Sequence, residues 1–144
     1  MQKMIHCACT ERCADVAPLV LRIATGLVFF IHGYTKLTTQ GVPGVSEFLG
    51  SLGFPAPDLF AIVLLTVEIV GGIALIAGLF THWAAKLTGI VAIVALVLVH
   101  VSNGFFVQNG GYEFVLLLIA ALVSIMVTGP GKYSLDHHWL KKHM

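Results

Sequence analysis

The 22 residues Leu59–Phe80 form an apolar stretch that constrains the possible folds of this chain more than any other feature. Their only charged residue is Glu68, which lies near the middle. A helix of this length, rising about 1.5 Å per residue, crosses a hydrocarbon core of about 30 Å. A carboxyl group at the centre opposes insertion by roughly 2–3 kcal/mol, but the surrounding aliphatic side chains offset that cost. We therefore predict a transmembrane helix whose Glu68 faces protein or water and has a partner inside the fold.

The composition of the whole chain indicates an integral membrane protein with one domain. Of its 144 residues, 58% are hydrophobic and 10% are charged, and the mean hydropathy is +0.94. Soluble proteins average about 45–50% apolar residues and about 25% charged residues. The formal net charge is only +1, so no basic face argues for a nucleic-acid partner. The first 17 residues contain charges and no apolar core, so we expect no cleavable signal peptide.

The hydropathy pattern predicts an all-α fold with four membrane spans. The predicted spans are residues 18–37, 59–80, 83–103 and 112–128, between a head of residues 1–17 and a basic tail of residues 129–144. Residues 38–57 carry apolar side chains at the i, i+3, i+4, i+7 spacing, which predicts a short amphipathic helix at the membrane surface. Short connections favour an antiparallel four-helix bundle.

The basic residues that flank the spans predict the orientation in the plasma membrane. One side would hold Lys3, Arg12, Lys86, Lys132, Lys141 and Lys142, and the other only Lys36. This asymmetry predicts that both termini are cytoplasmic. The cysteines of the head are then expected to be reduced thiols.

Each predicted span has one face on which ionisable residues coincide with small residues. Buried polar groups in a membrane point inward, and small residues mark helix–helix contacts. By this reasoning Arg22, about one turn inside the cytoplasmic boundary, is the best partner for Glu68 at mid-membrane. The pair predicts either a proton relay or quinone-headgroup site, or a structural ion pair that fixes helix register.

Other polar residues of the spans are expected to gather near the outer boundary. This outer cluster contains His32, Lys36, His100, Asn103 and Glu113. We predict a continuous polar vein from the cluster through Glu68 to Arg22. Glu68, Arg22, His100 and Glu113 are the candidate catalytic residues, and His32, Lys36 and Asn103 are candidates for cofactor binding. His32 and His100 could also ligate haem or a metal, but a hydrogen-bonded polar vestibule is the preferred interpretation.

The head and the tail contain further candidate ligands. The head carries four soft ligands within eight residues, His6, Cys7, Cys9 and Cys13. They predict a Zn²⁺ or Cu(I) site or an exchanging dithiol, with idle thiols as the alternative. In the tail, Asp136, His137 and His138 could bind a metal, although a solvated tail is preferred.

The sequence also resembles the DoxX family of small four-span membrane proteins over Leu21–Asp136. The resemblance rests on LRIATGLVFFIHGYTKL, on VEIVGG followed by AGLFTHWAA, and on VHVSNGF, GGYEFVLLLI and GPGKYSLD. It implies the same fold and membrane location. It also implies an association with membrane redox complexes, since the family is named after a subunit associated with a terminal quinol oxidase. The cysteine head has no counterpart in the family pattern.

These observations predict a membrane subunit of a quinone- or quinol-linked redox system, such as an oxidoreductase subunit. The polar vein would handle protons or a small polar substrate, with quinone as the cofactor. The expected partners are the lipid bilayer, a soluble or membrane redox protein, and a second copy of the chain. One alternative is a small transporter or channel-like bundle for an ion or solute. The other is a non-catalytic assembly subunit of a membrane complex.

Overall fold

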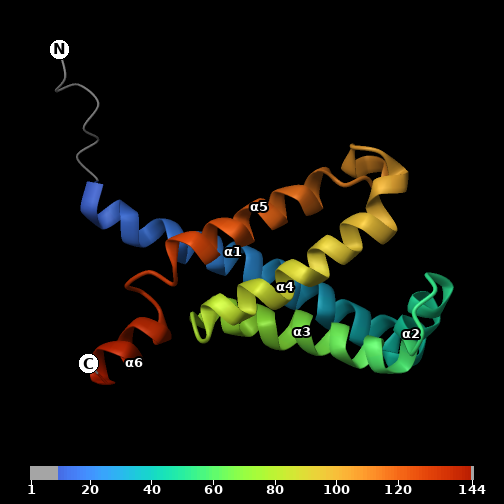
Figure 1. The fold of residues 1–144 in the computed structure, drawn as a ribbon, viewed down its shortest axis with the longest axis horizontal. Helices are drawn as coiled ribbons and strands as arrows, with labels where there is room; N and C mark the ends of the chain where they lie inside the picture. The colour runs from blue at the N-terminus through green and yellow to red at the C-terminus, as the bar shows by residue number, and fades with distance from the viewer. Residues whose placement is uncertain (1–9, 144) are drawn as a thin grey trace, which may run out of the picture.

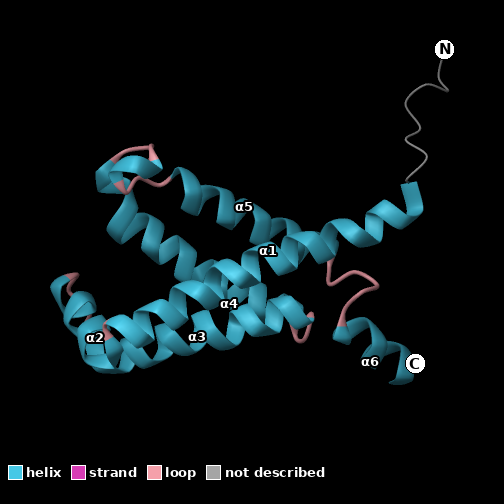
Figure 2. Ribbon diagram, turned by 180° about the vertical axis from the view of Figure 1, so that it is seen from behind, coloured by secondary structure: helices cyan, strands magenta, loops and turns pink. Residues whose placement is uncertain are grey.

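The computed structural model of the protein describes the backbone of residues 10–143 and the side chains of residues 15–139. Within these limits the fold is all-helical, without strands. The helices are α1 (Thr10–Thr39), α2 (Gly41–Ser51), α3 (Pro57–Ala77), α4 (Thr81–Ala95), α5 (Glu113–Thr128) and α6 (Leu135–His143). A π-helical turn, Leu96–His100, continues α4, and two short 3-10 turns lie between it and α5. Figures 1 and 2 show this arrangement from opposite sides.

Three helical segments are long and apolar enough to cross a membrane. They are Asp15–Thr39, Pro57–Ala77 and Thr81–Asn103, and they match the first three predicted spans. The fourth predicted span corresponds to α5, which is shorter at 16 residues. Large apolar side chains are exposed on the outward faces of these helices, as expected where lipid rather than water surrounds them. The prediction of an all-α membrane protein is confirmed.

Glycine residues bring α1 and α3 into close contact. A Cβ atom on Gly26 would lie 2.7 Å from the carbonyl oxygen of Gly72, and one on Gly72 would lie 2.7 Å from the backbone nitrogen of Phe30. Neither position has room for any larger residue, because the atoms that it would meet belong to the opposite backbone. Such small-residue contacts let membrane helices approach closely without a hydrophobic driving force. The α1–α3 pair is therefore the most tightly packed part of the fold.

The second pair, α4 and α5, lies against α1 and α3 at one end and diverges from them toward the other (Figure 1). We call these the α6 end and the α2 end, after the short helix at each. At the α6 end, a core that includes Leu75, Ala85, Leu122 and Ile125 joins α3, α4 and α5. At the α2 end, Val45 and Leu49 of α2 pack instead on Ala61 and Leu65 of α3. The divergence leaves space between the two pairs toward the α2 end.

Candidate functional site

Glu68 on α3 is buried and forms an ion pair with Lys36 of α1. Lys36 Nζ donates to Glu68 Oε1, and the side chain of Glu68 is 5% exposed, against 30% for Lys36. The two helices are close here because Gly33 faces Glu68, where an added Cβ would lie 2.8 Å from Glu68 Cβ. Lys36 follows Gly33 by about one turn, so its long side chain reaches back to the carboxylate. The second oxygen, Oε2, is buried without a hydrogen-bond partner among the described residues.

Arg22 does not meet Glu68, so the predicted pair is wrong. The guanidinium is fully buried, and it donates from Nη1 to Leu75 O at 3.0 Å and from Nη2 to Tyr133 O at 2.8 Å. Leu75 lies two turns beyond Glu68 on α3, roughly 10 Å along the axis. The physical reason is that α3 ends at Ala77, and the last carbonyl groups of a helix have no partner within it. Arg22 donates to Leu75 O, which also accepts from Gly78 N at 3.2 Å, and it places a positive charge at the negative end of the helix dipole.

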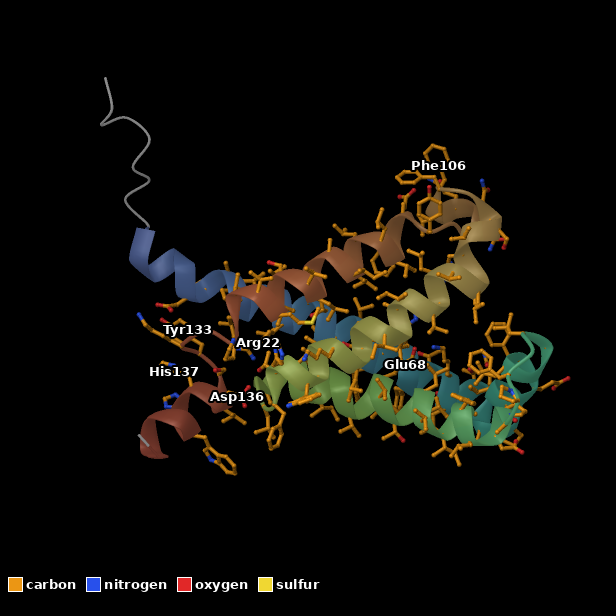
Figure 3. All side chains as sticks on the ribbon, in the orientation of Figure 1. Arg22, Glu68, Phe106, Tyr133, Asp136 and His137 are labelled. Carbon is orange, nitrogen blue, oxygen red and sulfur yellow. The ribbon has the colours of Figure 1, made fainter. Side chains whose placement is uncertain are left out.

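The predicted continuous polar vein is interrupted between Arg22 and Glu68. The close contact between Gly26 and Gly72 lies between Arg22 and Glu68 along the α1–α3 interface. No side chain projects from either glycine, and the backbones meet directly. The polar residues therefore form two separate groups, one with Arg22 at the α6 end and one with Glu68 at the middle of α3, and Figure 3 shows Arg22 and Glu68 apart.

The tail completes the group around Arg22. The carboxylate of Asp136 accepts hydrogen bonds from Phe80 N at 2.7 Å and from Thr81 N at 2.8 Å, at the start of α4. Asp136 N donates in turn to Gly78 O at 2.9 Å. Phe80 adopts a left-handed conformation with φ of 47°, so this turn is strained and held from outside. We call Arg22, Gly78, Tyr133 and Asp136 the clasp; Figure 3 shows three of them together.

The Lys36–Glu68 pair lies at the wall of a cavity between the two helix pairs. The cavity has a volume of about 600 Å³ and is lined by residues from α1 to α5, including His32 and His100. Most of the lining is apolar, with Phe29, Val45 and Val115 among its buried members. Pockets of about 300–1,000 Å³ with apolar walls and few polar groups are typical of small-molecule sites. The cavity is the candidate functional site.

His100 is held at the edge of this cavity with a defined tautomer. Its Nδ1 lies 2.7 Å from the carbonyl oxygen of Gly110, which can only accept, so Nδ1 carries the hydrogen. In the neutral ring Nε2 is then unprotonated and can accept a hydrogen bond or a proton. Asn103 Nδ2 also donates to Gly110 O, at 3.3 Å. His100 ends the π-helical turn that continues α4, and such turns are frequent at functional sites.

The structure thus gathers only part of the predicted outer cluster around the cavity. Glu68, Lys36, His32 and His100 line it. Asn103 and Glu113 instead organise the loop before α5, where Glu113 Oε2 accepts from Val107 N at 3.1 Å. His6, Cys7 and Cys9 and the side chain of Cys13 lie outside the described residues, so metal binding by the head stays a prediction.

The described residues hold no group of three His, Cys, Asp or Glu side chains able to bind a metal. For Asp136, the role observed is the contact with the α3–α4 turn. Nothing in the sequence around Asp136 pointed to this role. The two residues whose amides it binds, Phe80 and Thr81, lie 56 and 55 positions earlier in the sequence.

These features define a helical membrane protein with a partly polar cavity between its helices. The chain belongs to the DoxX family, whose sequence profile matches residues 17–101. A Bacillus subtilis (strain 168) protein named "Putative oxidoreductase CatD" is 33% identical over 122 residues, covering 85% of this chain and 86% of the relative.

Two Escherichia coli (strain K12) relatives are called inner membrane proteins. YqjF is 29% identical over 92% of this chain and 98% of its own length, and YphA is 30% identical over 82% and 86%. The membrane location of this chain agrees with those names. No solved structure gives a significant match.

Proposed function

We propose that the protein binds a quinone or quinol headgroup in the cavity and serves as the membrane subunit of a redox system. The observation that carries this proposal is the ion pair of Lys36 and buried Glu68 at the wall of a mostly apolar cavity. A ligand that fits must present a mostly apolar body and a few polar atoms on a ring. Quinones have this character, and they are carried within the bilayer.

The polar groups of the cavity match the two ends of such a ring. Lys36 Nζ can donate to a carbonyl oxygen, while the Glu68 carboxylate and His100 Nε2 can accept from a hydroxyl group. A quinone pool supplies two-electron, two-proton chemistry. In this chain Glu68 and His100 would take up or release the protons, each acting as a general acid or base. The electrons would pass to a soluble or membrane redox partner.

The relatives support a redox role without defining the reaction. The Bacillus subtilis relative has the word oxidoreductase in its name. The close contact of Gly26 with Gly72 favours a binding site over a channel, because it closes the route between Glu68 and Arg22. A pure assembly subunit would have no need for an ion pair at the wall of a cavity.

We further propose that α5 is a fourth span, that α2 lies at the membrane surface, and that both termini are cytoplasmic. A membrane-impermeant thiol reagent applied to intact cells should then leave Cys7, Cys9 and Cys13 unlabelled. A cysteine introduced by Gly53→Cys, in the loop after α2, should react in a variant whose native cysteines are serine. Labelling of the native cysteines in intact cells would contradict the orientation.

Binding of short-tailed ubiquinone and menaquinone analogues to the purified protein in nanodiscs tests the main proposal. Calorimetry should detect binding to the wild type and its loss in Lys36→Met and Glu68→Gln. The matched controls are Lys86→Met and Glu47→Gln, which change the same residue types away from the cavity and should bind normally. Absence of binding to the wild type, or equal loss in the controls, would overturn the proposal.

A further inference from the structure

We infer that the ligand enters and leaves the cavity from the lipid, through an opening between α3 and α4, and that it therefore carries a long apolar tail. This inference rests on the proposed function and narrows it. It selects a membrane-dissolved quinone over a small water-soluble ring.

A side chain that both lines the cavity and is exposed marks the rim of an opening. On the α3 side these are Phe60 and Val63, which are 39% and 46% exposed. On the α4 side they are Ile90, Val94 and Leu98, which form one stripe at four-residue spacing. Every side chain of this rim is apolar, so the opening faces hydrocarbon at no cost in unsatisfied polar groups. We call it the α3–α4 portal.

The opposite rim, between α1 and α5, differs in chemistry. It carries exposed His32 and Gln40 together with Phe114. A hydrocarbon tail that passed here would leave an imidazole and an amide without water, at a cost of roughly 1–3 kcal/mol for each group. This side suits water and protons, and the α3–α4 portal suits the tail.

The remaining walls of the cavity are more closed. At the α2 end, Val45 and Leu49 of α2 line the cavity and are buried against α3, and Phe48 is the one described α2 residue of the lining that is exposed. Ser46 Oγ also donates to Asp58 Oδ1, which attaches α2 to the start of α3. Toward the α6 end, buried Phe29 and Ala92 form the wall.

The cavity is too small to hold a whole isoprenoid tail. About 600 Å³ accommodates a substituted ring and the first part of a tail, but not a tail of many isoprenoid units. The remainder of the tail must lie outside the protein. With the ring near Glu68, the tail would leave between Val63 and Val94.

Photolabelling of the wild-type protein tests the path directly. A long-tailed quinone with a diazirine on its second isoprenoid unit would be irradiated with the protein in nanodiscs, and the labelled residues mapped by mass spectrometry. We expect labels on the rim of the α3–α4 portal, displaced by excess unlabelled quinone. Displaceable labels at His32 or Phe114 instead would overturn the inference and leave quinone binding intact.

Blocking the portal provides a second test. Val63→Trp combined with Val94→Trp should slow binding of the long-tailed quinone by about tenfold or more, and slow a short-tailed analogue less. Val70→Trp with Val97→Trp is the matched control, since both valines are 58% exposed on the same membrane segments and do not line the cavity.

The outcomes separate the two proposals. If the portal and control variants both bind the long-tailed quinone at the wild-type rate, the portal is wrong and the quinone site stands. If the wild type binds neither the short-tailed nor the long-tailed quinone, the proposed function fails and the portal for a quinone tail fails with it.

Discussion

The α6 end and the α2 end of this protein each hold a basic side chain of α1, and they stabilise its charge in different ways. Arg22 is fully buried and donates to backbone carbonyls of α3 and of the tail. Lys36 is partly exposed and pairs with Glu68, whose second oxygen has no partner among the described residues. At the α6 end both Nη atoms of Arg22 have acceptors, while Arg22 Nε and Thr81 Oγ1 are buried without a hydrogen-bond partner among the described residues. At the α2 end the ion pair lies at the wall of the cavity.

Arg22 is held within the fold, whereas Lys36 lines the cavity and is partly exposed. A fork of five donors on a planar guanidinium matches fixed carbonyl groups and leaves little freedom. A lysine ammonium on a flexible stem can move to a ligand and return. Arg22 and Lys36 both count as one basic residue in a hydropathy profile. In the structure Lys36 lines the cavity, and Arg22 is not part of its lining. Four predictions test this difference, ordered by the expected loss of stability.

Arg22→Leu should cause the largest loss. It removes two charge-assisted hydrogen bonds, worth about 1.5–3 kcal/mol each. We expect the free energy of unfolding, measured by denaturing-detergent titration, to fall by about 3 kcal/mol or more. Ile23→Leu, on the exposed face, is the control. A variant as stable as wild type would show that the clasp does not stabilise the fold.

Gly72→Ala should disturb both ends at once. The new Cβ would lie within 2.7–2.8 Å of backbone atoms of Phe30 and Gly26, so α1 and α3 must separate. Overpacking of this kind costs about 1–3 kcal/mol.

Quinone binding should weaken in Gly72→Ala as well, because Lys36 and Glu68 lie on the two helices that move. The control is Gly50→Ala in α2, where the nearest atoms are 3.8 Å away and helix propensity predicts a gain of about 0.5–1 kcal/mol. Loss of stability with unchanged binding would show that the two ends are independent.

Asp136→Asn should loosen the clasp more mildly. Asparagine keeps one acceptor oxygen but replaces the other with an amide group that cannot accept. We expect a loss of about 1 kcal/mol, similar to that of a helix N-cap, and faster hydrogen exchange at Phe80 or Thr81. Asp15→Asn is the control, a carboxylate that pairs with Lys132 at an exposed site, where the expected loss is about 0–1 kcal/mol. Unchanged exchange at both amides would contradict the capping role.

Lys36→Met and Glu68→Gln should have the smallest effect on stability and the largest on binding. Lys36 is partly exposed, so the coupling free energy between the two side chains should be about 1 kcal/mol or less. The double-mutant cycle in the same detergent titration measures it. A coupling as large as the effect of Arg22→Leu would mean that this pair is also structural, and the contrast between the two ends would be lost.

The sequence by itself determined the class of the protein and the approximate positions of its apolar helices, but not α6. Length and hydropathy are enough for this, because an apolar segment in a bilayer must satisfy its own backbone hydrogen bonds. Residues 38–57 also showed the stripe on which α2 packs, and Glu68 was correctly expected to be buried with a partner. The tendency of His32, Lys36 and His100 to gather followed from their similar depth.

Only the tertiary structure decided which charges meet. The register of α1 against α3 is set by Gly26 and Gly72, and it places Arg22 beside the end of α3, too far from Glu68. That end needs a donor for its free carbonyls, a demand that does not depend on side-chain charge and is not visible in a helical-face pattern. Asp136 reaches the same end from the tail through contacts distant in sequence. Depth can be counted along one helix, but partnership depends on the relative position of several helices, and packed backbone atoms fix that position.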